Sequence, residues 1–470
     1  MDPILAIDFG STYTKALLFD RGSADVVGVA HVPSTVGTDI TVGLRRVLDL
    51  LHESTGVQLR GVPSLACSSA AGGLRIAVIG LVPALSMEAA RRAALGAGGK
   101  VVGAYGYKLS RRAMEELVVL APDIVLLCGG TDGGDEETIL HNATALGRAN
   151  LAAPVIVAGN EFVVEECAQT LQSAGKTAYQ AHNLLPEVGR IEVRAVHDLI
   201  RDVFIRHITH AKGIDRVREH LELIADIIPT PSAVLTAARL IADGTGDMRG
   251  LGETVVIDVG GATTDVHSVS SGAPTRPGVV VRGLPELRAK RTVEGDLGMR
   301  INAPTIVERY GPDRLLALAA IAGALTPLTE ADIVEYAGRV ATRTAHIPGT
   351  DRERLMDHVL GRAAVALAIR RHAGTVRDVF TTTGTVPVQE GKDLGEVAVV
   401  VGVGGVLAHG GNARFVLEGV IGAGSDPQSL MPRRPALYLD QQYILYGIGL
   451  LSDVAPEAAL ASARRLLTPL

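Results

Sequence analysis

Short apolar runs separated by tight turns dominate the start of the chain. Residues 4–9, 15–20 and 25–31 each have the length and apolar character of a strand, and only a few residues separate them. Apolar residues at helical spacing follow over 40–53. The pattern predicts an antiparallel meander of three strands and then a helix.

The pattern changes between residues 61 and 195. Apolar runs at 75–81, 100–105, 123–128 and 154–159 recur about every 25 to 30 residues, with helical stretches between them. Strands that alternate with helices are typical of a parallel sheet built from βαβ units. We therefore predict an inserted α/β domain over 61–195.

The second half of the chain repeats the opening pattern. An apolar run again leads into an aspartate, glycines and threonines at Asp258, and a further apolar run ends in glycines at 402–405. The predicted organisation is a first domain at 1–60, the inserted domain at 61–195, connecting helices at 196–252, a second domain at 253–428, and a segment at 429–470 that returns to the first domain.

Composition narrows the range of functions. The 470 residues carry a net charge of −6 without a long basic run, which disfavours nucleic-acid binding. The three cysteines, Cys67, Cys128 and Cys167, are too far apart to suggest a zinc or iron–sulfur site, and we interpret them as buried thiols. The sequence shows neither a signal peptide nor an apolar run of the ~20 residues that span a bilayer. We expect a cytoplasmic protein that does not bind a membrane.

Two strand–turn–strand units carry the candidate chemistry. In each unit an aspartate ends the first strand, and a turn rich in glycine and hydroxyl side chains follows. Glycines allow backbone N–H groups to converge on an anion, and hydroxyls add further donors. The candidate residues are Asp8, Gly10, Ser11, Thr12, Thr14 and Lys15 in the first unit, and Asp258, Gly260, Gly261, Thr263 and Thr264 in the second.

These two units predict a site for the phosphates of ATP or ADP. Asp8 and Asp258 are the candidate catalytic residues, and each could hold Mg²⁺ through water while Mg²⁺ bridges the phosphates. Gly402, Gly404 and Gly405 form a third turn where a nucleoside could lie against the backbone. A glycine turn whose aspartate bonds to its own backbone is the alternative for either unit alone. Two such units followed by a third turn favour a nucleotide site.

This arrangement resembles the actin/Hsp70/sugar-kinase superfamily. The stretch 8–15 resembles its phosphate-1 motif, 258–266 its phosphate-2 motif and 401–405 its adenosine motif. The resemblance implies an α/β protein with two ribonuclease-H-like domains around ATP and Mg²⁺, into which the parallel α/β domain is inserted. Thr230 stands where the chaperone branch has a glutamate that positions water, so hydrolysis is expected to be slow unless another carboxylate serves.

Four longer stretches resemble the MutL/GlmL family of accessory proteins associated with glutamate mutase. They are CSSAAGGLRIAVIGLVP at 67–83, CGGTDGG at 128–134, KRTVEGDLGMR at 290–300 and LMPRRPALYLDQQYILYGIGLL at 430–451. The resemblance implies an ATP-driven chaperone that reactivates an adenosylcobalamin-dependent mutase by helping it exchange damaged cobalamin.

The inserted domain is expected to contact the mutase. Its spacing is similar to that of a cobalamin-binding module, but residues 61–195 lack the DxHxxG pattern that supplies the cobalt-ligating histidine. A partial match, Asp265 to Ser270, lies in the second turn unit and has Ser270 where glycine is required. We therefore expect no cobalamin ligand in this chain.

Three alternatives stay open. A small-molecule kinase of the same fold would need a substrate pocket with a base, and GGATTD at 260–265 is closer to the hydrolysing branch. An activator of a radical dehydratase would need clustered cysteines for an iron–sulfur cluster. A filament-forming protein would have to stack despite the large insertion. The sequence leaves the number of subunits open.

Overall fold

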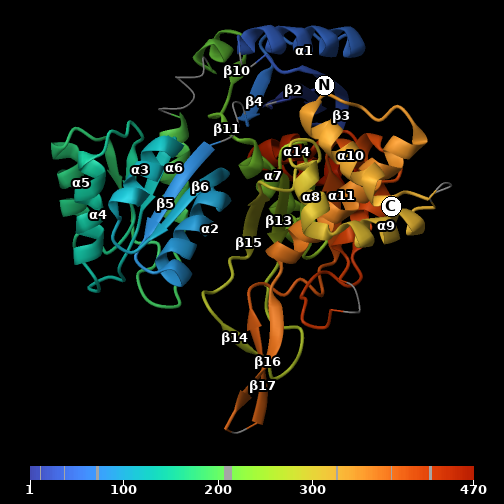
Figure 1. Ribbon diagram of the computed structural model, residues 1–470. Helices are drawn as coiled ribbons and strands as arrows, with labels where there is room; N and C mark the ends of the chain where they lie inside the picture. Colours follow the sequence, from blue (N-terminus) through green and yellow to red (C-terminus); the bar gives the residue numbers. More distant parts are fainter. Residues whose placement is uncertain are drawn as a thin grey trace. The chain divides into compact units, whose positions relative to one another are not determined.

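The structure is a computed structural model that describes residues 1–10, 12–35, 38–69, 74–205, 214–323, 327–382, 384–422 and 426–470. Ser11, a predicted phosphate-binding residue, therefore lies outside the described residues. Contacts divide the chain into two units (Figure 1). The first unit contains Met1–Thr236, Gly283–Pro285 and Tyr446–Ala459, and the second contains Ala237–Arg282, Glu286–Leu445 and Leu460–Leu470.

The first unit begins with the predicted meander, which is confirmed. Strands β1, β2 and β3 pair antiparallel, and β4 pairs parallel with the free side of β1. The helix α1 packs on β2 and β3, starting where the Asp39 side chain accepts a hydrogen bond from Thr41 N. The elements are β1 (Pro3–Phe9), β2 (Tyr13–Asp20), β3 (Asp25–Pro33), α1 (Ile40–Thr55), β4 (Pro63–Ser68), β10 (Glu222–Leu223), β11 (Ile228–Pro229) and α7 (Thr230–Asp243).

Two predicted features on either side of the inserted domain are wrong. The domain does not begin at residue 61, because β4 belongs to the first sheet through its pairing with β1. Residues 196–252 are not all helical either, because β10 and β11 both pair with β4, which extends the same sheet. Both errors concern short strands whose partners lie far away along the chain, and apolar spacing alone does not identify such pairs.

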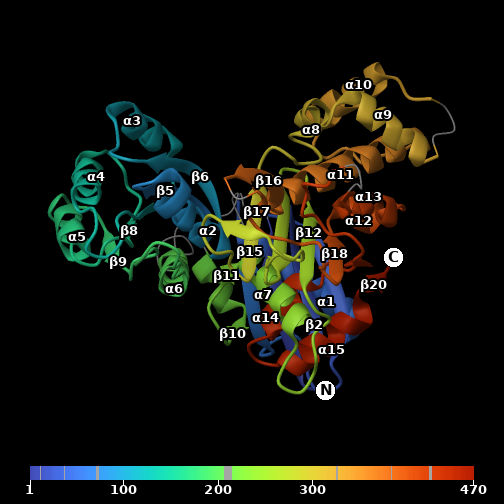
Figure 2. The same cartoon turned by 90° about the horizontal axis from the view of Figure 1, so that it is seen from below.

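The inserted domain is a parallel five-stranded sheet in the order β6-β5-β7-β8-β9. The parallel sheet and four of its strands agree with the prediction from the strand–helix alternation, and the short edge strand β9 was not predicted. Apolar residues of α2 and α6 cover one face, and those of α3, α4 and α5 cover the other (Figure 2). The elements are β5 (Leu74–Gly80), a π-helical turn (Pro83–Met87), α2 (Glu88–Gly96), β6 (Gly99–Gly106), α3 (Arg111–Leu120), β7 (Ile124–Leu127), α4 (Glu137–Arg148), β8 (Val155–Val157), α5 (Val164–Ser173), β9 (Ala178–Gln180) and α6 (Arg194–Val203).

The second unit repeats the strand order of the first. Strands β12, β13 and β15 form an antiparallel meander, and β18 pairs parallel with β12 and is followed by β19. Both sheets thus run third, second, first, fourth, which is the ribonuclease-H-like order expected of an actin-like fold. The strands are β12 (Thr254–Val259), β13 (Thr264–Val269), β15 (Ala289–Glu294), β18 (Val399–Val403), β19 (Ala436–Leu439) and β20 (Thr468–Pro469).

The boundary predicted at residue 429 also needs correction. Strand β19 pairs with β18 and belongs to the second unit, and only Tyr446–Ala459 of the final segment belongs to the first. Pairing with β18 keeps β19 in the second sheet. Gly447 lies in the part that returns to the first unit, and it packs so closely on the first sheet that an added Cβ would lie 2.4 Å from Leu17 Cδ1. The final segment includes α14 (Leu445–Leu451) and α15 (Pro456–Leu466).

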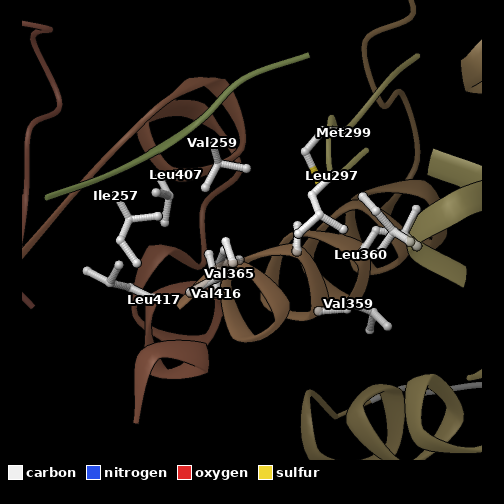
Figure 3. Packing of buried hydrophobic residues seen from close by; sticks show 14 of the residues in the cluster. Ile257, Val259, Leu297, Met299, Val359, Leu360, Val365, Leu407, Val416 and Leu417 are labelled. Carbon is white, nitrogen blue, oxygen red and sulfur yellow. The ribbon is translucent and has the colours of Figure 1, made fainter. Parts of the chain in front are cut away.

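A long buried helix organises the core of the second unit. Helix α11 (Asp351–His372) packs Val359, Leu360 and Val365 among apolar side chains that come from β12 and from α12 and α13 (Figure 3). The other helices are α8 (Ala303–Tyr310), α9 (Pro312–Ile321), α10 (Glu330–Thr342), α12 (Gly405–His409) and α13 (Ala413–Leu417). A separate three-stranded sheet contains β14 (Val280–Arg282), β16 (Thr375–Thr381) and β17 (Gly384–Glu390). Among the described residues, no helix is both long enough and apolar enough to cross a membrane.

Candidate nucleotide site

The two predicted turns have the same backbone construction. In the first, Gly10 N donates to Tyr13 O at 3.0 Å, and in the second Gly260 N donates to Thr263 O at 2.9 Å. Each bond closes a turn directly after the strand that carries the aspartate. Matching register positions in the two hairpins are occupied by Asp8 and Asp258, by Lys15 and Asp265, and by Thr14 and Thr264.

Asp8 is a buried carboxylate surrounded by donors in the first unit. Its side chain is 2% exposed, and Oδ1 accepts a hydrogen bond from Thr230 Oγ1 at 2.7 Å. Lys15 Nζ lies 3.2 Å from Oδ2, and Cys67 Sγ lies 3.6 Å from Oδ1. Burial, together with the charge of Asp8, raises the pKa of the Cys67 thiol well above its usual value. The donors come from β2, β4 and α7, so three elements fix the orientation of this carboxylate.

The carbonyl groups of the first turn are held by Ser34, which directly follows β3. Its backbone N–H donates to Thr12 O at 2.9 Å, and its hydroxyl donates to Gly10 O at 2.7 Å. A Cβ on Gly10 would lie only 2.6 Å from Tyr13 O, so this turn requires glycine. Ser34 was missed in the sequence, where a lone serine after a strand carries no distinctive signal.

The carbonyl groups of the second turn point toward the segment 299–302. In a planar trans peptide the carbonyl and the following N–H point in opposite directions. The N–H groups of residues 261–263 therefore point away from that segment, and within the described part of the chain none of them donates a hydrogen bond. The bonds that orient the turn run from Met299 N to Gly260 O (3.0 Å), from Arg300 N to Gly261 O (2.9 Å) and from the Asn302 side-chain amide to Ala262 O (2.9 Å).

Close packing supports this orientation of the second turn. Gly298 lies so near the turn that an added Cβ would be 2.2 Å from the carbonyl carbon of Ala262. Three successive N–H groups that point outward carry partial positive charge, and such groups can bind an anion. The resemblance of residues 290–300 to a family motif did not reveal the supporting role of residues 299–302.

An ion pair lies beside the second turn. Arg291 on β15 donates to Asp265 Oδ1 from Nε at 3.0 Å and from Nη2 at 2.5 Å, and its side chain is 4% exposed. The Thr263 hydroxyl donates to the other oxygen of Asp265 at 3.1 Å. The single proton of this hydroxyl is therefore engaged with Asp265 in this structure. The charged residues near 290 are accordingly ion-paired, and Arg291 is buried.

The side chains of Thr14, Thr264 and His267 are buried in the interior of the protein. Thr14 and Thr264 are fully buried, and the Thr264 hydroxyl donates to Leu297 O at 2.7 Å. His267, in the partial match to the cobalamin pattern, is also buried, and this burial lowers its pKa to about 3 and leaves the imidazole neutral. These buried side chains do not reach the outer surface of the second turn, where the backbone N–H groups of residues 261–263 lie.

The third predicted turn lies next to the second. Val403 on β18 pairs with Asp258, and Gly404 follows with a φ of 116°. A Cβ on Gly404 would lie 2.3 Å from Val259 O, whereas a Cβ on Gly405 would meet no atom within 4 Å. Gly404 is therefore required by the backbone, while Gly405 leaves open space beside Asp258.

The side chains of the described residues do not form a metal site on their own. Within these ranges no group of three or more histidine, cysteine or acidic side chains could hold a metal ion. Asp8 and Asp258 belong to different units, and each could supply one oxygen ligand. Mg²⁺ commonly takes one or two carboxylates and fills its remaining positions with water and phosphate oxygens. Each aspartate, taken by itself, is therefore of the kind that can hold a magnesium ion arriving with a nucleotide.

The duplicated sheet and its paired turns define a protein of the actin-like fold class, with two ribonuclease-H-like halves. Residues 4–467 match the family model described as MutL protein. The chain is 39% identical over 468 residues to Protein MutL of Clostridium tetanomorphum, and the match covers 99% of each chain. The chain therefore belongs to the MutL family.

Two solved structures show weaker similarity. The activator of the 2-hydroxyisocaproyl-CoA dehydratase from Clostridium difficile with bound ADPNP is 12% identical, and the match covers 98% of this chain and 97% of that one with a TM-score of 0.33. The xylulose kinase from Bifidobacterium adolescentis is 11% identical, with coverage of 99% and 95% and a TM-score of 0.32. With TM-scores this low, neither similarity supports a statement about function.

Proposed function

We propose that this protein binds ATP with Mg²⁺ through its paired turns and hydrolyses it slowly, as an accessory protein of a cobalamin-dependent mutase. The observation that carries the nucleotide part is the second turn, where the segment 299–302 holds three carbonyl groups and leaves three N–H groups oriented outward. Backbone N–H groups in this arrangement bind phosphate oxygens.

Each group has a role in this proposal. Asp8 and Asp258 hold Mg²⁺ through water and orient the attacking water molecule. In the first turn, Gly10 shapes the backbone and the residues after it, Ser11 and Thr12, bind phosphate. In the second turn, Gly260 has the same shaping role and the N–H groups of residues 261–263 bind phosphate, with Thr14, Thr263 and Thr264 supporting the turns. Gly402, Gly404 and Gly405 accommodate the nucleoside. Lys15 balances the charge of Asp8 and is within reach of a phosphate, and Thr230 orients Asp8 in place of a glutamate.

The partner proposal rests on family membership. We propose an adenosylcobalamin-dependent mutase similar to glutamate mutase as the partner, and the inserted domain as the part that contacts it. The protein would act in the cytoplasm and drive the exchange of damaged cobalamin without ligating cobalt. The three cysteines are buried free thiols, which is compatible with a reducing compartment.

Phosphate release without any added acceptor tests the nucleotide part. We expect Asp8→Ala to lower magnesium-dependent turnover by about 100-fold or more, because the side chain that orients metal and water is lost. Asp49→Ala is the matched control, since Asp49 is an exposed aspartate on α1 in the same unit. Unchanged turnover in folded Asp8→Ala protein would contradict the assignment. Turnover that needs a small-molecule acceptor would instead favour a kinase.

Reactivation of an inhibited mutase tests the partner part. A mutase from the same genome is inactivated with cyanocobalamin and then incubated with this protein, ATP, Mg²⁺ and adenosylcobalamin. We expect activity to return with ATP and not without it, and the Asp8→Ala protein should fail. If no mutase recovers, the accessory role is wrong although ATP binding can still stand. Bound iron in the purified protein would favour the dehydratase activator instead.

A further inference from the structure

Residues 283–302, here called the linking segment, run from the inserted domain to the second turn. Contacts assign Gly283–Pro285 to the first unit, although the chain on both sides of them belongs to the second. The segment then continues through β15 and ends with the residues that hold the carbonyl groups of the second turn. One short stretch of chain therefore has an attachment in each unit.

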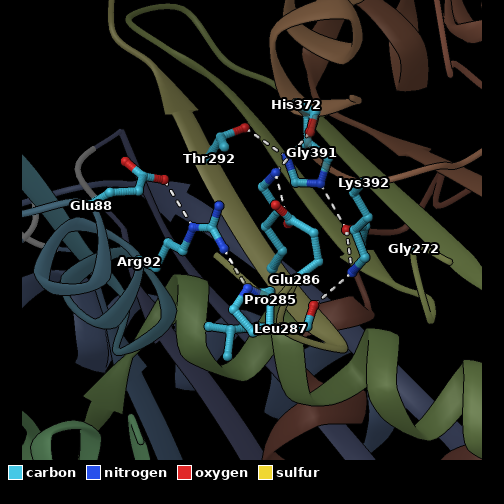
Figure 4. Close-up of polar contacts among 12 residues, drawn as sticks. Glu88, Arg92, Gly272, Pro285, Glu286, Leu287, Thr292, His372, Gly391 and Lys392 are labelled. Carbon is cyan, nitrogen blue, oxygen red and sulfur yellow. Dashed lines mark hydrogen bonds and ion pairs between the residues drawn. The ribbon is translucent and has the colours of Figure 1, made fainter. Parts of the chain in front are cut away.

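The beginning of the linking segment is anchored in the inserted domain. Leu284 is 5% exposed and belongs to the apolar cluster that includes buried residues of β5 and α2. Arg92 on α2 donates from Nη1 to Pro285 O at 2.8 Å, and Glu88 holds the same guanidinium at 2.9 Å (Figure 4). An apolar side chain and a charge-assisted hydrogen bond thus fix this end.

A buried ammonium fixes the middle of the segment to the second unit. Lys392 is fully buried, and its Nζ donates to Leu287 O at 2.9 Å and to Arg288 O at 2.7 Å (Figure 4). The lysine stem fits because residue 272 is glycine with a φ of 66°, where a Cβ would lie 2.4 Å from Lys392 Cγ. Leaving these carbonyl groups without a donor in the interior would be costly, so this part of the segment moves together with the core of the second unit.

The remainder of the segment is held along its length. Glu286 and Lys290 form an ion pair at 3.2 Å, and β15 pairs with β13 from Ala289 to Glu294. Arg371 on α11 binds Glu294 at 2.7 Å, near the start of the stretch that supports the turn. A paired strand of this kind is a rigid element that can carry coupling between the groups attached to its two ends.

We propose that the linking segment couples nucleotide binding at the second turn to the inserted domain. This inference rests on the proposed function, since it requires phosphate on the outward N–H groups of the second turn. Phosphate binding there acts on the carbonyl groups that residues 299–302 hold, and β15 passes the displacement to Leu284 and Pro285. Coupling of this kind is reciprocal, so a partner that holds the inserted domain changes nucleotide affinity by the same factor.

Hydrogen exchange on the full-length protein, with and without Mg²⁺ and a non-hydrolysable ATP analogue, tests the coupling. In the wild type we expect the nucleotide to change exchange in peptides of the second turn and also in α2. Leu284→Ala and Arg92→Ala should retain the change at the turn and lose the change in α2. Arg91→Ala is the matched control, because Arg91 also bonds to Glu88 but its bonds do not extend to Pro285.

Two results would overturn the coupling. One is a wild-type protein in which nucleotide alters the second turn but leaves residues 74–205 unchanged. The other is a wild-type response of α2 in both Leu284→Ala and Arg92→Ala. If nucleotide changes exchange nowhere, including the second turn, then nucleotide binding itself is wrong and the coupling falls with it.

Discussion

Asp8 in the first half and Asp258 in the second occupy the same position of the same hairpin, but the residues opposite them differ. Lys15 pairs with Asp8 across the first hairpin, whereas a second acid, Asp265, pairs with Asp258 across the second. In the first half the cation is therefore next to the predicted catalytic carboxylate. In the second half the cation, Arg291, neutralises the neighbouring acid instead.

The supports of the two turns differ as well. One residue, Ser34, holds the first turn, whereas a segment of several residues holds the second. In both halves the support comes after the third strand of the meander in the sequence, at Ser34 after β3 and at residues 299–302 after β15. The duplicated fold thus determines where the support lies, but different residues provide it in the two halves. In the first half the Asp8 carboxylate is held in orientation, and in the second half the backbone of the turn is.

The largest expected difference in stability between the halves comes from replacing the residue opposite each aspartate. Asp265→Asn should destabilise the second half by about 3–5 kcal/mol, because it removes the negative charge of a buried ion pair with Arg291. Lys15→Met should cost about 1–2 kcal/mol in the first half, because Asp8 keeps its bond from Thr230. Hydrogen exchange of β13 and β2 peptides in denaturant measures the two halves separately. Equal destabilisation by the two substitutions would contradict the expected energetic difference between the residues opposite Asp8 and Asp258.

The fourth strands allow a second comparison, because β18 ends in a glycine turn while β4 leads toward the inserted domain. Gly404→Ala should cost about 2–4 kcal/mol, since alanine resists a φ of 116° and would collide with Val259 O. Gly405→Ala should change stability by less than about 0.5 kcal/mol but weaken ATP binding. Thermal unfolding and ATP titration of both variants separate these effects. Unaltered ATP affinity in Gly405→Ala would contradict the nucleoside assignment.

The buried ammonium of the second half predicts a pH dependence. Burial and, to a smaller extent, the nearby charge of Lys290 lower the pKa of Lys392 from 10.5 to about 7, and Glu286 opposes this shift. Between these values the unfolded chain binds more protons than the folded one, so stability rises with pH by at most about 1.4 kcal/mol per unit. From pH 7 to 9, denaturant titrations should show the wild type gaining about 2–3 kcal/mol over Lys392→Met. A constant difference between the two proteins would refute this.

The last and smallest loss expected from removing a contact concerns the Thr230 hydroxyl, which donates to Asp8. Its nearest counterpart in the second half is Arg291, which donates to Asp265. Thr230→Val removes the donor at 2.7 Å with little change in shape and should cost about 1.5 kcal/mol. Turnover should fall together with stability, because the carboxylate loses its orientation. Steady-state phosphate release and thermal unfolding measure the two effects, with Thr236→Val on the same helix as the control. A loss of stability without any loss of turnover would make Thr230 purely structural.

Local patterns predicted the parts of the fold that are local. The meander of β1, β2 and β3 and four strands of the inserted domain (β5, β6, β7 and β8) follow from apolar spacing and glycine turns, and the structure confirms them. Strands β10 and β11 were missed because each is two residues long and pairs with β4 more than 150 residues earlier. Pairing at such distances depends on tertiary context, which apolar periodicity does not contain.

The site shows the same division. Both turns and the third glycine turn could be predicted, because each is a compact motif with its chemistry in neighbouring residues. The bond between Thr230 and Asp8 joins residues 222 positions apart, and the support of the second turn comes from backbone groups of residues 299–302. Backbone donors can belong to any residue type, so side-chain patterns do not identify them.

The thiol beside Asp8 gives the protein a native chemical reporter. Because Cys67, Cys128 and Cys167 are all buried and burial raises the pKa of each thiol, reagents that attack thiolates should react slowly with the folded chain. A single cysteine placed on the surface could therefore be labelled selectively without removing the native ones. The slow reaction of Cys67 itself would then measure how often the packed structure around Asp8 opens, and how far a bound ligand reduces this opening.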